Sequence, residues 1–84
     1  MNEKLLKRIV KKETGLAMKN CQIRSVFYTR DDVYIDYLDL TELGHFNHKT
    51  EKIAFWPDQL ETHRILVPEE VKQEVADNML RRMK

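Results

Sequence analysis

The sequence has a single cysteine, two glycines, two prolines and no long apolar run. With only Cys21, the chain can form neither an intramolecular disulfide nor a zinc site built from cysteines, and a reducing, cytoplasmic setting is expected. No stretch approaches the roughly 18 apolar residues of a membrane-spanning helix. The N-terminus lacks the uninterrupted apolar segment of a secretory signal. We therefore expect no membrane insertion.

The composition is that of one small globular domain. The chain has 84 residues, of which 42% are hydrophobic and 35% are charged. Two separate cores would each be too small to stay folded, so residues 1–84 are interpreted as a single domain. The two glycines, Gly15 and Gly44, are far apart, which excludes a glycine-rich phosphate-binding loop.

The charge is unevenly distributed along the chain. The net charge is +1, yet residues 1–30 carry eight basic and two acidic side chains, whereas residues 31–84 carry seven basic and twelve acidic ones. Such asymmetry concerns partners and association kinetics rather than the fold.

A helix is predicted at each end of the chain. Over residues 3–14, Leu5, Leu6, Ile9 and Val10 share one helical face, and Gly15 is a natural stop. The second helix is predicted to start at Pro68, with acidic residues in its first turn and basic ones in its last. Its apolar stripe comprises Val71, Val75, Ala76, Met79, Leu80 and Met83.

Between the helices, β-branched and aromatic residues predict an antiparallel sheet. Residues 22–29 and 33–40 form a hairpin, and residues 52–56 form a third strand that Pro57 ends. Residues 58–67 fit a short helix or a fourth strand, and residues 39–44 fit a helical turn or a loop. The expected class is α+β, in the order α-β-β-β-(short element)-α.

Both faces of this sheet carry apolar side chains. Regular alternation places Ile23, Phe27, Val33, Ile35, Tyr37, Ile53 and Phe55 on one face and Val26, Tyr28, Tyr34, Leu38, Ala54 and Trp56 on the other. Either a helix covers each face, or residues 57–67 wrap the second face, or the second face contacts another protein. In the last case Tyr28, Tyr34, Leu38 and Trp56 are the candidate interface residues.

Candidate catalytic and metal-binding residues are few. His45 and His48 have a metal-like spacing, but a structural zinc site usually needs four ligands including sulfur, so these histidines are interpreted as surface residues. Asp36 lies on a strand, where Arg24 of the neighbouring strand is expected to pair with it. We therefore predict no catalytic residue, no metal, no cofactor and no small-molecule ligand.

The expected order of elements resembles the double-stranded RNA-binding domain in topology alone. That family has a basic start to its final helix, where this chain has the acidic Pro68-Glu69-Glu70, so the function is not carried over. Two hypotheses remain. The first is a non-enzymatic protein-interaction module (an adaptor, inhibitor or regulatory subunit), which could be a homodimer. The alternative is a nucleic-acid-binding accessory protein that uses Lys4, Lys7, Arg8, Lys11 and Lys12 of the first helix.

Overall fold

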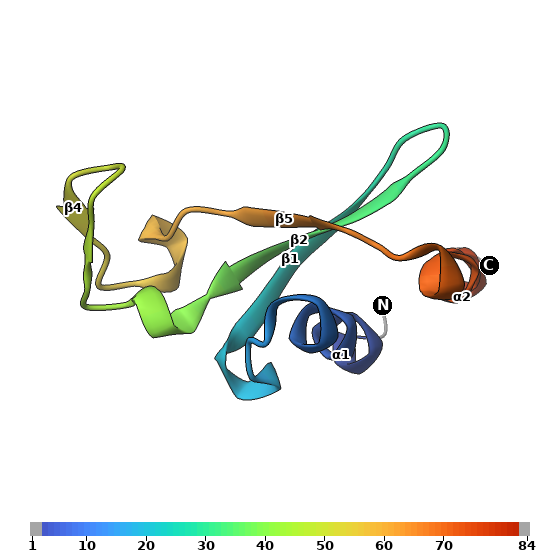
Figure 1. The fold of residues 1–84 in the computed structure, drawn as a ribbon, viewed down its shortest axis with the longest axis horizontal. Coiled ribbons are helices and arrows are strands. Elements are labelled where there is room, and N and C mark those ends of the chain that lie inside the picture. The colour runs from blue at the N-terminus through green and yellow to red at the C-terminus, as the bar shows by residue number, and fades with distance from the viewer. Residues whose placement is uncertain (1–2, 83–84) are drawn as a thin grey trace.

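The computed structural model describes the backbone of residues 3–82 and the side chains of residues 3–77. The fold consists of an N-terminal helix, a three-stranded antiparallel sheet and a C-terminal helix, with a two-stranded hairpin at one end (Figure 1). In chain order the elements are α1 (Glu3–Thr14), β1 (Cys21–Tyr28), β2 (Val33–Asp39), β3 (Phe46–Asn47), β4 (Lys52–Ile53), β5 (His63–Leu66) and α2 (Glu69–Arg82). The expected α+β class is confirmed.

The bounds of α1 agree with the predicted residues 3–14. Leu6, Ile9 and Val10 are buried on one side of the helix, as the 3.6-residue period requires. Gly15 ends the helix in a left-handed conformation with a φ of 82°, and its N–H donates to the carbonyl of Lys11 at 2.8 Å. A residue with a Cβ would be strained there, which explains the glycine.

The predicted hairpin of β1 and β2 forms, but β1 contains a β-bulge. Ile23 lies opposite Tyr37 and Ser25 lies opposite Asp36, so Arg24 has no partner of its own in β2. A bulge adds one residue to one strand and therefore shifts the alternation of every residue beyond it.

The bulge changes which residues of β1 share a face. Val26 pairs with Ile35 and Phe27 pairs with Tyr34. The prediction that Phe27 lies on the face of Ile35, and Val26 on the face of Tyr34, is therefore wrong. Tyr28, opposite Val33, likewise lies on the face of Ile35 rather than on that of Tyr34.

The third strand of the sheet is β5, which pairs antiparallel with β2. A strand forms within the predicted residues 52–56, but it covers only Lys52 and Ile53, and it pairs with β3 in a separate hairpin rather than with the sheet. For residues 58–67, the strand alternative is confirmed by β5, preceded by a 3-10 turn at Pro57–Gln59. Another 3-10 turn, Leu40–Glu42, follows β2, and the Asp39 carboxylate accepts a hydrogen bond from the Thr41 N–H at 2.9 Å.

Both helices pack on the same face of the sheet. Figure 1 shows α1 and α2 on one side of the strands. One buried cluster contains Leu6, Ile9, Val10, Cys21, Val33, Ile35, Tyr37, Val67 and Val75, and thus joins both helices to that face. The alternative of one helix on each face is therefore wrong. We call the opposite face, which no helix covers, the open face.

α2 begins at Glu69, directly after Pro68, and Val75 is its most deeply buried described residue. Its Lys72 ammonium donates to the carbonyl of Asp31, which ties the helix to the β1–β2 turn. The side chains of Met79, Leu80 and Met83, also predicted for the apolar stripe, lie outside the described residues.

The molecule is elongated. Its radius of gyration is 13.8 Å and its extents are 40 × 24 × 24 Å, whereas a compact domain of this length has a radius near ~12 Å. The hairpin of β3 and β4 lies at one end of the long axis and α2 lies near the other (Figure 1). No helix within the described residues is long and apolar enough to cross a membrane.

Candidate functional site

The structure does not bring the four predicted interface residues together. Tyr34 is half-buried on the open face, whereas Tyr28 lies on the helix-covered face beside α2. Leu38 is fully buried and cannot contact a partner. Trp56 is 66% exposed, but it lies outside the sheet, in the segment that follows β4. Tyr28, Tyr34, Leu38 and Trp56 therefore do not form one surface.

On the open face, an arginine of β5 covers the aromatic rings. The guanidinium carbon of Arg64 lies 4.7 Å from the centre of the Phe27 ring and 5.8 Å from that of Tyr34. The same guanidinium donates two hydrogen bonds to the Asp36 carboxylate, at 2.7 and 3.0 Å. The aromatic rings of this face thus already have an internal partner.

The partner of Asp36 differs from the expected one. Arg64 pairs with it, not Arg24, because the bulge leaves Arg24 without a position opposite β2. The hydrogen bond from Arg64 is the main reason that the pKa of Asp36 is lowered, although burial of the carboxylate opposes it. Ser25 adds a third hydrogen bond at 3.3 Å. The strand carboxylate is held ionised by an ion pair.

The largest apolar exposure lies on the arm, which we define as residues 44–56. Phe46 and Ile53 face each other across the β3–β4 ladder, and they are 52% and 44% exposed. Phe55 and Trp56 follow directly and are 64% and 66% exposed. We call Phe46, Ile53, Phe55 and Trp56 the apolar arm residues. None of them belongs to the buried core cluster.

Backbone and amide hydrogen bonds hold the arm in shape. The N–H of Gly44, at a φ of 78°, donates to the carbonyl of Ala54 at 2.7 Å and closes the base of the arm. The side-chain oxygen of Gln59 accepts from the N–H groups of Phe55 and Trp56, at 2.9 and 3.2 Å. The two most exposed aromatic residues therefore stand on a fixed backbone.

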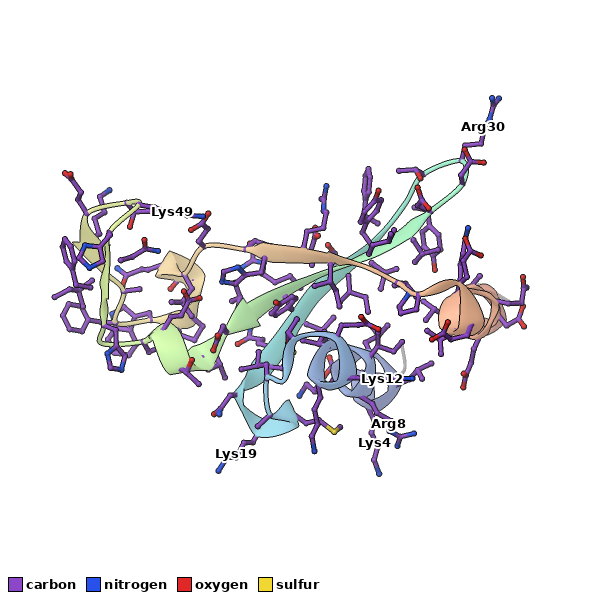
Figure 2. The ribbon with its side chains drawn as sticks, in the orientation of Figure 1. Lys4, Arg8, Lys12, Lys19, Arg30 and Lys49 are labelled. Atoms are coloured by element: carbon purple, nitrogen blue, oxygen red, sulfur yellow. The ribbon has the colours of Figure 1, made fainter. Side chains whose placement is uncertain are left out.

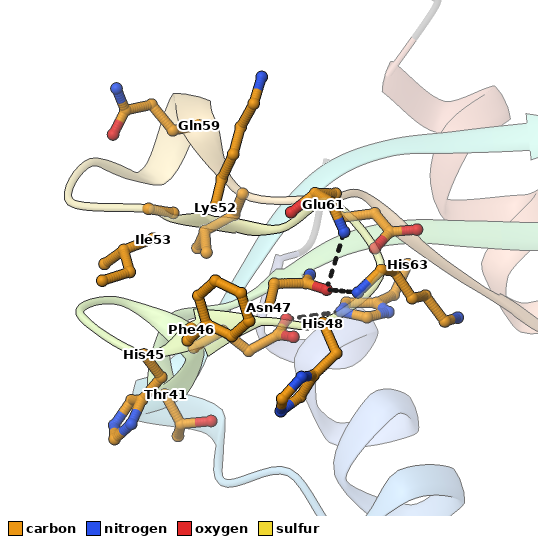
Figure 3. Close-up of a pocket in the computed structure, with 15 residues that line it drawn as sticks. Thr41, His45, Phe46, Asn47, His48, Lys52, Ile53, Gln59, Glu61 and His63 are labelled. Carbon is orange, nitrogen blue, oxygen red and sulfur yellow. Dashed lines mark hydrogen bonds and ion pairs between the residues drawn. The ribbon is translucent and has the colours of Figure 1, made fainter.

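A groove of about 880 Å³ lies between the arm and the segment leading to β5 (Figure 3). Phe46, Ile53, His48, Leu60 and His63 are among the residues that line it. At one side, Nε2 of His63 lies 2.7 Å from Oε1 of Glu42. The groove is thus walled by apolar and polar groups together, and it adjoins two of the apolar arm residues.

The chain has three histidines and one cysteine. Within the part of the chain that the structure describes, no three histidine, cysteine or acidic side chains are grouped as a metal ion requires. Cys21 is buried, and burial raises the pKa of its thiol, with a smaller opposing effect of Lys7. Since the thiolate is the nucleophilic form, this cysteine is suited to packing rather than to attack.

The structure places the predicted basic residues together on α1. Lys4, Arg8, Lys11 and Lys12 are exposed and Lys7 is half-buried. None of the three ion pairs found among the described side chains involves them.

Sequence reasoning missed Phe46 and Arg64. Phe46 lies in the polar stretch 45–50, where no strand was predicted, although Phe46 and Ile53 flank a polar turn as strand partners do. Arg64 gave no such signal, because its role depends on the pairing of β5 with a strand that lies far away in the sequence.

Comparison with known proteins gives no relative. No known family model, curated protein or solved structure matches this chain.

Proposed function

We propose that this chain is a non-enzymatic protein-interaction module, and that it binds a second copy of itself through the apolar arm residues. The observation that carries this proposal is the exposure of Phe46, Ile53, Phe55 and Trp56 on a segment outside the core. Aromatic side chains with a large exposed area are the usual anchors of protein interfaces.

The exposed area suits a pair of such arms. From the exposed fractions, and about 150–250 Å² for a whole aromatic side chain, the four residues offer roughly 450 Å² of surface. A standard interface buries about 800 Å² on each partner, of which about 60% is apolar. The arm therefore supplies nearly the whole apolar part of one half-interface, and an identical arm supplies the other half.

The charges around the arm favour a second copy as the partner. Lys49 and Lys52 lie in the same segment as Glu51, and Asp58 and Glu61 follow shortly after. A two-fold axis brings the same patch of both copies together. Because the patch carries both signs of charge, each copy can place its lysines opposite the carboxylates of the other.

Sedimentation equilibrium over a wide range of protein concentrations tests this proposal. The protein is expected to form a dimer, and Phe55→Ser with Trp56→Ser is expected to weaken the dimer on the order of 100-fold. Trp56 is the only tryptophan. Its fluorescence should therefore shift to shorter wavelength with rising protein concentration, and the shift should need a higher concentration in Phe55→Ser.

The matched control is Phe27→Ser with Leu66→Ser. Phe27 and Leu66 are 45% and 53% exposed but belong to the sheet, so their loss should leave the dimer intact. A protein that stays monomeric at millimolar concentration contradicts the proposal, and so does a dimer that depends on Phe27 and Leu66 instead.

A further inference from the structure

The basic residues of α1 share one arc of the helix surface. At about 100° of turn per residue, Lys4, Lys7, Arg8, Lys11 and Lys12 fall within an arc of about 140°. Glu3 and Glu13, the acidic residues of the helix, fall outside this arc on the same geometry. Figure 2 shows Lys4, Arg8 and Lys12 on one side of the molecule, with Lys19 on the same side.

No ion pair among the described side chains involves this face. The ion pairs of those side chains lie at His63, Arg64 and Lys72. Lys4, Arg8 and Lys12 are spaced four residues apart, so they repel one another along the helix. An ordinary solvated surface intersperses both signs of charge and avoids this repulsion.

The chemistry of the face indicates the class of partner. No aromatic or large apolar side chain lies between the cations, whereas protein interfaces are rich in aromatic residues and poor in lysine. The apolar side of α1 is buried in the core, so it cannot insert into a lipid surface. A regularly spaced polyanion needs only the cations, and the phosphodiester backbone of nucleic acid is such a polyanion.

The length of the row of cations on α1 also matches the spacing of phosphates along a nucleic-acid strand. Four helical residues rise about 6 Å, so the row from Lys4 to Lys12 extends about 12 Å. One nucleic-acid strand carries a charge every ~3.4 Å along its axis, so the row spans three to four phosphates.

We propose that the basic face of α1, formed by Lys4, Arg8, Lys11 and Lys12 with Lys19 beside it, binds the phosphate backbone of nucleic acid. This binding is independent of the arm and goes beyond the proposed self-association. It depends on charge rather than on base sequence, since no side chain of the face is placed to read a base edge.

Fluorescence anisotropy with labelled oligonucleotides of about 20 nucleotides tests the proposal, at about 50 to 200 mM salt. Single-stranded DNA, duplex DNA and RNA are the three probes. At least one should bind at the low salt concentration, and log affinity should fall with log salt with a slope of about −3 to −4. Arg8→Glu should weaken binding at least tenfold and make the slope shallower.

Two controls separate the basic face from other effects. Arg30→Glu makes the same charge change in the exposed β1–β2 turn, far from α1 (Figure 2), and should leave binding nearly unchanged. Arg8→Glu should also raise the melting temperature, because it replaces the repulsive contacts with Lys4, Lys11 and Lys12 by attractive ones. Weaker binding by a more stable protein cannot result from unfolding.

The remaining outcomes are equally decisive. Failure of all three probes to bind at low salt would overturn the proposal, as would equal losses of affinity in Arg8→Glu and Arg30→Glu. Polyglutamate of the same length that competes as well as nucleic acid would assign the face to acidic proteins instead. Binding that persists in Phe55→Ser with Trp56→Ser would separate this proposal from the self-association of the arm.

Discussion

Asp36 is the residue on which the open face of the sheet depends most. It joins β1 through Ser25 and β5 through Arg64, and Arg64 in turn covers Phe27. Asp36 belongs to β2, the central strand, so its carboxylate links all three strands of the sheet. Its ionised form is the one that makes these contacts.

Asp36→Asn is therefore expected to destabilise the protein at neutral pH and to make no difference in acid. The pKa of Asp36 is lowered in the folded state, mainly by the Arg64 hydrogen bond. Its contribution is then present above the unfolded carboxyl pKa and is lost as the pH falls below about 4. We expect a loss of up to about 1 kcal/mol at pH 7, because water screens the half-exposed pair.

Urea unfolding of both proteins at pH 7 and at pH 3 measures this difference. Asp58→Asn is the control, because Asp58 is exposed and makes no ion pair with the described side chains. The free energies of unfolding of Asp36→Asn and the parent protein are compared at each pH. If they differ as much at pH 3 as at pH 7, the carboxylate charge is not the cause.

Among the elements, β1 is distinguished by its bulge. Arg24 is one residue more than the ladder needs, and Ile23 and Ser25 already face opposite sides of the sheet. Without Arg24, the two would be neighbours in a regular strand and would keep those sides.

Deletion of Arg24 is expected to preserve the fold, with a change of only about 1 kcal/mol in the free energy of unfolding. Deletion of Asp36, in the middle of β2, should unfold the protein. It would move Tyr37 and Leu38, both buried, to the wrong faces. Circular dichroism during thermal unfolding measures the stability of both deletion variants. Asp36→Asn is the control, because it removes the ion pair and keeps the strand register. Equal damage from the two deletions would show that the bulge itself is required.

The elements also show which parts of the fold can be predicted from the sequence. The bounds of α1 follow from a local pattern and from Gly15, and the β1–β2 hairpin follows from two apolar runs beside a short turn. The bulge leaves no mark in composition. The choice between residues 52–56 and β5 as the third strand depends on distant pairing, because both have suitable residues.

The candidate site was predicted only in part. Trp56 was one of the four candidate interface residues, and it is 66% exposed. The other three candidate interface residues do not lie beside Trp56, because the prediction placed Trp56 in the sheet with Tyr34 and Leu38. The basic residues of α1 were grouped correctly, since a helical face can be read from spacing alone.

On the scale of the whole molecule, the arm lies at one end of a particle 40 Å long (Figure 1). A dimer through the arm is therefore an end-to-end dimer. Small-angle scattering should give a maximum dimension approaching ~80 Å for such a two-fold pair. Pairing along the open face would instead add width and leave the length nearly unchanged. A maximum dimension that stays near that of the monomer would exclude the arm as the contact.

The hydrogen bond between the Gly44 N–H and the Ala54 carbonyl has a consequence for how the sequence of this protein can change during evolution. It closes the residues between them into a loop that none of the core side chains enters. Substitutions inside the loop can therefore change its exposed surface, while the rest of the chain maintains the fold. For the same reason, the loop is a natural place to install a foreign recognition sequence.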